Sequence, residues 1–236
     1  MKALILNSGL GSRMGELTKT HPKCMTEIAP GETIVSRQLR MLSKAGVKDV
    51  VMTTGVFEEV LREYCDGLGL PVRIQYVRNP LCRETNYIYS IYCAREALDD
   101  EILLMHGDLV FEETVLQELM DSEKSCMAVS SAVPLPEKDF KAVVTGGVIR
   151  KVGIEFFEHA VAAQPLYHLR REDWKLWLGK IGEFCEAGNV KVYAENALNE
   201  LDGACGIVPM DVGVRLCGEI DNPEDLRAVM KKLEEL

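Results

Sequence analysis

The stretch of the sequence best suited to chemistry is LILNSGLGSRMGELTKTHPKCMTEI, residues 4–28. An apolar run leads to Gly9 and Gly11, and Arg13 follows at once. Pro22 and Lys23 come later in the same stretch. Glycines let the backbone approach a ligand, and their N–H groups can donate to phosphate oxygens. A guanidinium is a planar fork suited to a polyphosphate, whereas an ammonium is a compact charge suited to one phosphorus. The pattern therefore predicts a site for a nucleoside triphosphate.

Three other interpretations of the glycine loop fit less well. A dinucleotide fingerprint would need a third glycine where Met14 stands. A P-loop would need a Gly-Lys pair at a spacing that this loop does not have. The loop could also be a plain strand-to-helix turn in which Arg13 and Lys23 are simply solvated. We favour the triphosphate loop because all of its parts occur together.

Alternating strands and helices would hold these residues in place. Apolar runs predict buried strands at residues 2–7, 47–55, 71–79 and 101–111, the last of which breaks at Gly107. The segments between them predict helices at residues 33–44, 56–69 and 85–99. This order implies a three-layer α/β fold with a mostly parallel sheet, in which ligands bind at the carboxyl ends of strands. The glycine loop and Asp108 both lie at such ends.

The second half of the chain is less regular. Residues 126–134 and 152–157 resemble strands, and residues 142–152 predict a hairpin that turns at Gly146 and Gly147. Residues 171–188 predict a helix, and Trp174 and Trp177 fit its buried side. A last helix is expected from residue 223 to 236, with Asp221 or Asn222 as its N-cap. No linker is visible, so we expect a single domain over residues 1–236.

Composition limits the classes of function. The chain has 236 residues and a net charge of -10, which argues against nonspecific binding to nucleic acid or to an anionic membrane. Its 8 cysteines form no Cys-x-x-Cys pair, and we expect reduced core thiols in a cytoplasmic protein. The N-terminal apolar run is too short for a signal peptide, and no run approaches the ~18 apolar residues of a membrane span.

The chain resembles the nucleotidyltransferase (NTP-transferase) family. The resemblance rests on Gly9-Leu10-Gly11-Ser12-Arg13, then Thr18, then Pro22-Lys23, which match the signature G-x-G-x-R, T, P-K. The segment RNPLCRETNYIYSIY, residues 78–92, is similar to the phosphocholine and 2-aminoethylphosphonate cytidylyltransferases. The resemblance runs over nearly the whole chain but is thin from residue 122 to 215. It implies a three-layer Rossmann-like nucleotidyltransferase fold with a mostly parallel mixed sheet.

The resemblance also implies roles for individual residues. Lys23 and Arg13 would be catalytic, and Asp108 and Asp221 would hold Mg²⁺. By spacing alone, Asp108 could equally be a turn residue, and Asp221 could be a helix cap. The expected nucleotide site comprises Leu6, Asn7, Ser8, Gly9, Leu10, Gly11, Ser12, Arg13, Lys23, Asn86, Ser90 and Gly107. Asn86 could instead be only the cap of its helix.

A second set of residues resembles the acceptor pocket of the phosphocholine enzymes. The expected acceptor residues are Tyr193, Glu195, Asn196, Glu219 and Lys191. Lys191 stands where an acid is expected, and Phe140 is the only aromatic residue near the position of the cage tryptophan. These departures favour a primary amine, or an uncharged hydroxylated acceptor, over choline. Whether Lys191 and Phe140 face the pocket is left open.

The implied activity is a Mg²⁺-dependent cytidylyltransferase. It would transfer CMP from CTP to 2-aminoethylphosphonate or phosphocholine and release pyrophosphate. The alternatives are a sugar-1-phosphate nucleotidylyltransferase that uses UTP, dTTP or GTP, and a nucleotide-binding sensor without chemistry. The expected partners are small molecules, and a homodimer is left open. Of the histidines, His21 could contact phosphate, while His106, His159 and His168 receive little weight.

Overall fold

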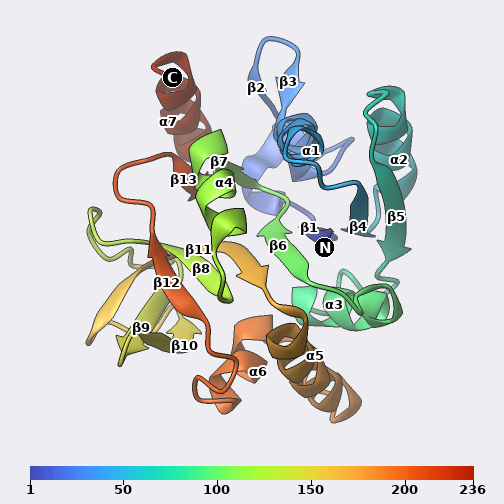
Figure 1. Ribbon diagram of the computed structural model, residues 1–236. Helices are drawn as coiled ribbons and strands as arrows, with labels where there is room; N and C mark the ends of the chain where they lie inside the picture. Colours follow the sequence, from blue (N-terminus) through green and yellow to red (C-terminus); the bar gives the residue numbers. More distant parts are fainter.

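Figure 1 shows a computed structural model of the chain that describes residues 1–236, apart from the side chain of Ser12. A mixed sheet of nine strands forms the middle layer, and helices cover both of its faces. The first strand contacts both helical layers, because its side chains alternate between the two faces of the sheet. Leu4 and Leu6 pack into the core on one face, and Ala3 and Ile5 pack into the core on the other. The predicted three-layer α/β fold is confirmed.

The first half of the chain builds the parallel part of the sheet. Its strands are β1 (Lys2–Asn7), β4 (Asp49–Thr54), β5 (Arg73–Arg78) and β6 (Ile102–His106). They pair in the order β6-β1-β4-β5, and every pair is parallel. The helices between them are α1 (Ile34–Lys44), α2 (Glu58–Gly67) and α3 (Tyr87–Ala94), which continues as the 3-10 turn η3 (Arg95–Ala97). Each of these strands and helices was expected from the sequence.

The second half adds five strands to the same sheet. They are β8 (Cys126–Ser130), β9 (Lys141–Thr145), β10 (Val148–Gly153), β11 (Ala160–Leu169) and β12 (Val208–Asp211). All of their pairings are antiparallel except that of β12, which pairs parallel with β8. Strand β11 pairs antiparallel with β6, β8 and β9, so it joins the two halves. The sequence did not predict β11, because its alanines are poor strand formers and Pro165 lies where its pairing with β8 shifts register.

Two predicted strands in this half are partly wrong. Strand β8 ends at Ser130, so residues 131–134 are not in a strand. The β9–β10 hairpin is confirmed, but β10 ends at Gly153, and residues 154–157 are not in a strand. The chain folds back sharply there. A Cβ atom on Gly153 would lie 2.5 Å from Glu155 Oε2 and 2.9 Å from the ring of Phe156. This segment therefore leaves the sheet, and its Ile154 borders a cavity described below.

The remaining elements complete the two helical layers and the rim of the sheet. The helices are α4 (Glu113–Asp121), α5 (Arg171–Glu186), α6 (Ala194–Glu200) and α7 (Pro223–Glu234). Two small antiparallel pairs are β2 (Glu27–Ala29) with β3 (Glu32–Thr33), and β7 (Leu109–Phe111) with β13 (Cys217–Glu219). The 3-10 turns η1 (Ser12–Thr18) and η2 (Lys23–Met25) follow the first strand. Helices α1, α2 and α4 cover one face, and α3, α5 and α6 cover the other (Figure 1).

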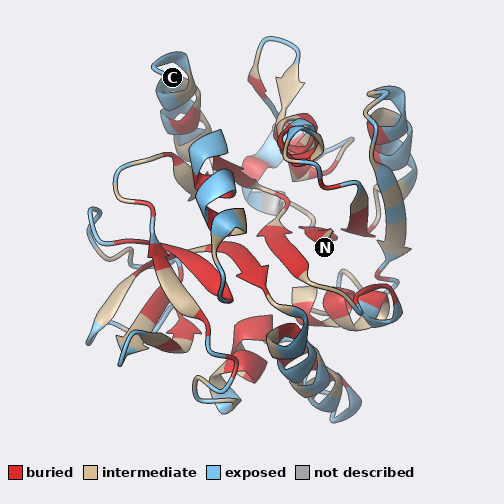
Figure 2. Cartoon of the chain, viewed as in Figure 1, coloured by how far each residue is buried: buried red, intermediate tan, exposed pale blue. Residues whose placement is uncertain are grey.

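The core lies on the two faces of the sheet, and the outer sides of the helices are exposed (Figure 2). Trp174 and Trp177 are fully buried in the core next to α3 and α6, as expected. The 8 cysteines are free thiols. None of the helices in the described part of the chain is long and apolar enough to cross a bilayer. A single domain over residues 1–236 stays a prediction.

Candidate active site

The glycine loop leaves the carboxyl end of β1 and turns back toward Lys23. Gly11 has a φ of 62°, in the left-handed region that favours glycine. A Cβ atom on Gly11 would also lie 3.0 Å from the Cβ atom of Lys23. The Thr18 hydroxyl donates to the carbonyl oxygen of Gly11 at 2.9 Å and closes the loop. Gly11 therefore contacts both Thr18 and Lys23, and these contacts explain the spacing of the three residues in the sequence.

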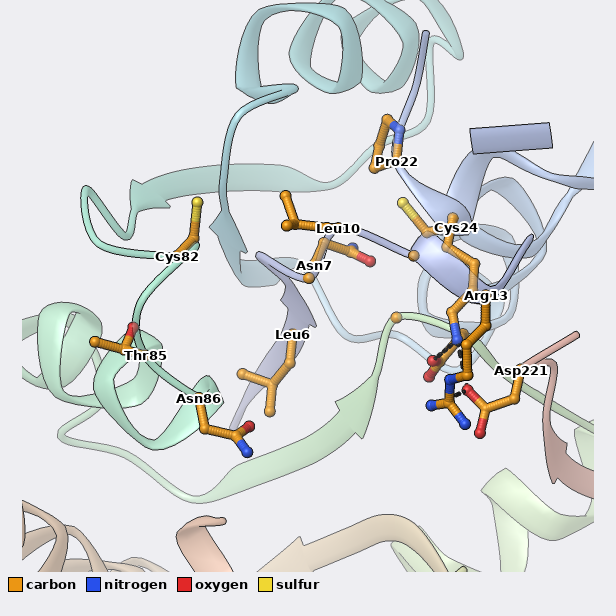
Figure 3. A pocket seen from close by; sticks show the side chains of 15 residues that line it. Leu6, Asn7, Leu10, Arg13, Pro22, Cys24, Cys82, Thr85, Asn86 and Asp221 are labelled. Atoms are coloured by element: carbon orange, nitrogen blue, oxygen red, sulfur yellow. Dashed lines mark hydrogen bonds and ion pairs between the residues drawn. The ribbon is translucent and has the colours of Figure 1, made fainter. Parts of the chain in front are cut away.

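Two cations and two carboxylates meet beside this loop. Lys23 Nζ lies 2.5 Å from Asp108 Oδ2 and 2.8 Å from Asp221 Oδ1. The guanidinium of Arg13 lies 2.9 Å from the same oxygen of Asp221, and the two side chains point toward one another in Figure 3. The β7–β13 pair brings Asp221 to Asp108, because the N–H of Ile220 donates to the carbonyl oxygen of Asp108 at 3.0 Å.

Each charged group in this cluster stabilises the charged form of its neighbours. Burial disfavours the Lys23 ammonium, but the carboxylates of Asp108 and Asp221 outweigh it and raise the pKa of Lys23. Burial likewise disfavours the Asp108 carboxylate, but Lys23 and His106 lower its pKa. Lys23 is therefore cationic and Asp108 anionic at neutral pH.

The two aspartates have the chemistry of a Mg²⁺ site. Carboxylate oxygens are preferred ligands of Mg²⁺, which usually takes one or two of them from the protein. Both carboxylates contact the same ammonium, so they converge on the space of one small cation. The N-cap of α7 is Asn222, whose side chain accepts from the N–H groups of Glu224 and Asp225, and this leaves the Asp221 carboxylate free for the cluster. The residues fit the metal, and the assignment stays a prediction.

A cavity of about 420 Å³ extends from this cluster along the glycine loop (Figure 3). Nine of the expected nucleotide residues line it: Leu6, Asn7, Gly9, Leu10, Gly11, Arg13, Lys23, Asn86 and Gly107. Pro22, Cys24, Cys82 and Thr85 also line it and were not expected. Arg13 and Asp221 stand at one end in Figure 3, and Cys82 and Thr85 stand at the other. The charged end is suited to phosphates.

Three of the expected nucleotide residues have a different placement or description. Ser8 lines an adjoining cavity of about 170 Å³. Ser90 is buried beneath the loop, where its hydroxyl lies 2.6 Å from Ser8 Oγ and accepts from Asn79 at 2.9 Å. Ser90 therefore supports the loop instead of facing the cavity. The side chain of Ser12 lies outside the described part of the structure. Asn86 both caps α3 and lines the cavity, so its two interpretations are compatible.

Gly107 follows β6 and packs tightly against the end of β1. A Cβ atom there would lie 1.6 Å from Asn7 Oδ1 and 2.8 Å from the carbonyl oxygen of Leu6. Only glycine leaves room for the Asn7 side chain at this contact. The break in the apolar run at Gly107 thus sets the distance between the glycine loop and Asp108.

A second cavity, of about 280 Å³, opens on the other side of the charged cluster. Its lining includes Arg13, Asn86, Tyr87, His106, Asp108, Lys138, Asp139, Phe140, Ile154, Tyr193, Glu219 and Asp221. Tyr193 and Glu219 were expected there. Phe140 also faces it, and its ring packs edge-on against Tyr193 at 5.1 Å between centroids. We call this space the acceptor cavity.

The other expected acceptor residues do not line the acceptor cavity. Glu195 is buried and accepts hydrogen bonds from the hydroxyls of Tyr87 and Tyr167, so it supports Tyr87. Asn196 Oδ1 accepts from the N–H of Tyr193 at 3.0 Å and caps α6. Lys191 is exposed and is not among the residues that line the described cavities.

The structure places His106 in the site, although its sequence context gave it little weight. Its Nδ1 lies 2.8 Å from Glu219 Oε1, and its ring packs against Tyr87 on the wall of the acceptor cavity. Burial lowers its pKa, but the acids around it outweigh burial and raise the pKa to about 9. Burial and the charge of Asp108 raise the pKa of Glu219. The available signal was its position at the carboxyl end of a predicted strand, two residues before Asp108. His21 contacts only its neighbour among the hydrogen-bond partners described, with Nδ1 3.1 Å from the Pro22 carbonyl oxygen.

Comparison with known proteins identifies the family of this chain. The sequence profile of the MobA-like NTP transferase domain matches residues 3–174. The chain belongs to this family. The match includes the glycine loop, Lys23 and Asp108, and it ends before Asp221. The resemblance to the nucleotidyltransferases is thereby confirmed for this MobA-like domain.

Several characterised proteins are similar to this MobA-like chain. The CMP-5'-(3-aminopropyl)phosphonate synthase of Streptomyces rubellomurinus is 38% identical over 178 residues, which are 72% of this chain and 28% of that protein. The CTP:phosphoglutamine cytidylyltransferase of Campylobacter jejuni is 25% identical over 55% of this chain and 52% of its own length. The choline-phosphate cytidylyltransferase of Streptococcus pneumoniae is 26% identical over 52% of this chain and 51% of its own length. The matched region thus spans about half or less of each relative.

Solved structures share the fold. The inositol-1-phosphate CTP transferase of T. maritima superimposes with a TM-score of 0.79 and 22% identity, over 99% of this chain and 96% of that one. The phosphocholine cytidylyltransferase of Streptococcus pneumoniae gives a TM-score of 0.75 and 19% identity, over 98% of each chain. At these identities the likeness shows the fold, and it confirms the expected nucleotidyltransferase architecture.

Proposed function

We propose that this chain transfers CMP from CTP to a small phosphonate or phosphate acceptor, with 2-aminoethylphosphonate the first candidate and phosphocholine the second. The observation that carries the proposal is the placement of the charged cluster between two cavities. Arg13, Asp108 and Asp221 line both the cavity of about 420 Å³ along the glycine loop, which we assign to the nucleotide, and the acceptor cavity. A group bound in one cavity is therefore presented to a group bound in the other across the same charges.

The proposed reaction is an in-line displacement at the α-phosphorus of CTP. An oxygen of the acceptor forms a bond to that phosphorus as its bond to the β-phosphate oxygen breaks, and pyrophosphate leaves. A phosphonate or phosphate oxygen is already ionised at neutral pH, so the residues need not remove a proton. The work of the protein is to position the two substrates and to neutralise charge.

Each charged residue has a part in this proposal. Lys23 stabilises the negative charge that accumulates at the α-phosphate. Arg13 and the N–H groups of the glycine loop hold the departing phosphates. Asp108 and Asp221 hold Mg²⁺, which would supply further charge neutralisation when bound.

The lining of the acceptor cavity supports an acceptor with a cationic end. Asp139 and Glu219 are acids on its wall, and Tyr87, Phe140 and Tyr193 offer aromatic faces that attract cations. The similarity to an aminopropylphosphonate synthase and to a choline-phosphate cytidylyltransferase supports the same class. Because CTP and such acceptors are metabolites of the cell interior, we also propose a cytoplasmic location.

The test is pyrophosphate release measured over CTP, UTP, GTP and dTTP, each paired with a panel of acceptors. We expect the highest kcat/KM with CTP and an aminoalkylphosphonate, and a CMP-linked product in the ³¹P spectrum. Turnover with a sugar 1-phosphate and another nucleotide would replace this proposal with the sugar alternative. A rise in Tm with CTP and Mg²⁺, with no pyrophosphate from any acceptor, would favour a nucleotide sensor.

A further inference from the structure

Lys141 is a lysine with no exposed surface, at the start of β9. An ammonium is costly to bury unless it is well paired. Its Nζ donates to the carbonyl oxygen of Pro136 at 2.6 Å and to that of Asp139 at 3.0 Å. It also lies 4.3 Å from the centroid of the Phe157 ring. Its described partners are therefore two backbone carbonyls and an aromatic face.

These partners belong to two segments outside the sheet. The first, residues 131–140, connects β8 to β9 and has no regular secondary structure. The second, residues 154–159, connects β10 to β11 and folds back after Gly153. The first segment contributes Lys138, Asp139 and Phe140 to the acceptor cavity, and the second contributes Ile154. We call the two segments together the acceptor wall.

The acceptor wall is bonded to the sheet at its ends, where the N–H of Ser131 donates to Asp211 and the carbonyl oxygens of Phe140 and His159 accept from the N–H groups of Ala163 and Val144. Between these ends it lacks the ladder of backbone hydrogen bonds that fixes a strand, and most of its first segment is exposed. Lys141 contacts both segments at once from a fixed position in β9, which pairs with β10 and β11. A hydrogen bond from a charged donor is worth more than one between neutral groups. A single buried cation can thus set the position of both segments.

We propose that Lys141 is a positioning residue that holds the acceptor wall in place and thereby sets affinity for the acceptor. It does not line the acceptor cavity among the residues described there, so it acts through Asp139, Phe140 and Ile154. The part of this inference that concerns the acceptor rests on the proposed function. The part that concerns the order of the wall does not.

The test compares Lys141→Met with Lys151→Met. Lys151 is a matched control, because its Nζ also donates to a backbone carbonyl, that of Asn199, at 2.7 Å, and it does not line the acceptor cavity. Loss of bonds from a charged donor predicts that Lys141→Met raises the KM for the acceptor about tenfold or more. The KM for CTP should stay unchanged, and amide hydrogen exchange should become faster in residues 131–140 and 154–159 only. Lys151→Met should leave the acceptor KM and the exchange of these segments unchanged.

Each outcome decides the question. Equal changes in the KM for CTP and for the acceptor, or faster exchange throughout the chain, would mean a general structural role and overturn the proposal. If Lys141→Met fails to fold, Phe157→Leu replaces it, because Phe157 is 52% exposed and its loss should be tolerated. Loss of the aromatic face predicts an acceptor KM raised by about two- to fivefold. An unchanged acceptor KM in that variant would overturn the proposal.

The same experiment separates this inference from the proposed function. If the wild-type chain releases no pyrophosphate with any acceptor, the proposed function fails, and hydrogen exchange alone decides the role of Lys141. Faster exchange confined to the acceptor wall in Lys141→Met would then support its hold on the wall. Unchanged exchange there would overturn it.

Discussion

At the scale of single residues, the position of Lys23 is constrained on several sides. Its ammonium is largely buried between Asp108 and Asp221, and its Cβ atom lies against Gly11. The preceding Pro22 fixes the backbone just before the η2 turn that carries Lys23. An ammonium held this rigidly can stabilise charge at a fixed point without reorganising during the reaction.

Replacing Lys23 by alanine should lower kcat by about 10² to 10³, the scale for losing one preorganised electrostatic donor. Steady-state pyrophosphate release measures the effect. Lys19→Ala is the matched control, because Lys19 is an exposed lysine of the same loop that pairs only with Glu16 among the ion pairs described. A Lys23→Ala enzyme that keeps the wild-type rate would show that this ammonium is not catalytic.

Replacing Asp108 by asparagine should abolish Mg²⁺-dependent turnover, because the amide keeps the shape of the side chain and removes its charge. The fold should persist, which the circular dichroism spectrum and a cooperative thermal transition would show. Calorimetric titration with Mg²⁺ in the presence of CTP should lose the binding signal of the wild type. Full activity at saturating Mg²⁺ would place the metal on other residues.

At the scale of elements, the site depends on how closely the ends of β1 and β6 approach each other. The two strands are parallel neighbours, so the glycine loop and Asp108 leave the sheet side by side. The small β7–β13 pair then returns Asp221 from near the end of the chain to the same place. The site is therefore assembled by strand pairing, and the exact positions of its residues depend on the close contact at Gly107.

Gly107→Ala tests this contact. The added methyl group would meet Asn7 Oδ1 at 1.6 Å, so Asn7 and the glycine loop must shift. We expect weaker binding of CTP, measured as a smaller rise in Tm on adding the nucleotide, and lower kcat/KM. Gly182→Ala is the control, because a Cβ atom at this position in α5 would meet nothing within 4 Å. Wild-type affinity for CTP in Gly107→Ala would show that the loop adapts freely.

At the scale of the whole molecule, two large cores on opposite faces of one sheet hold the site. The core beside α3 and α5 includes Trp177, whose Nε1–H donates to the carbonyl oxygen of Ala194 at 2.9 Å. Ala194 begins α6, and Tyr193 just before it lines the acceptor cavity. The hydrogen bond from Trp177 to Ala194 thus links this core to Tyr193 and the acceptor cavity.

Trp177→Ala should lower the free energy of unfolding by about 3–5 kcal/mol, the cost of truncating a large buried aromatic side chain. Chemical denaturation measures the change. Leu176→Ala is the control in the same helix, because Leu176 is 49% exposed, and its effect should stay within about 0.5 kcal/mol. Equal losses in the two variants would contradict the assignment of Trp177 to the core.

The parallel half of the fold was predictable because its signals are local. A buried parallel strand is a short apolar run, and glycines and caps mark the helix ends, so β1, β4, β5, β6 and their helices follow from the sequence. Strand β11 was not predictable in this way. Its register against β8 shifts around Pro165, and its stability comes from pairing with three other strands, of which β6 and β8 lie far from it in the sequence.

By itself the sequence determined the glycine loop, since Gly9, Gly11, Arg13, Thr18 and Lys23 lie in one short stretch whose spacing is set by local contacts. Only the tertiary structure decided the rest of the site. Strand pairing brings Asp221 and Glu219 beside Asp108 and His106. Tertiary packing buries Ser90 against Ser8 and Glu195 against Tyr87 and Tyr167, and it places Phe140 in the acceptor cavity. The physical reason is that side-chain direction in these segments depends on long-range packing and hydrogen bonds, which no local pattern of residues records.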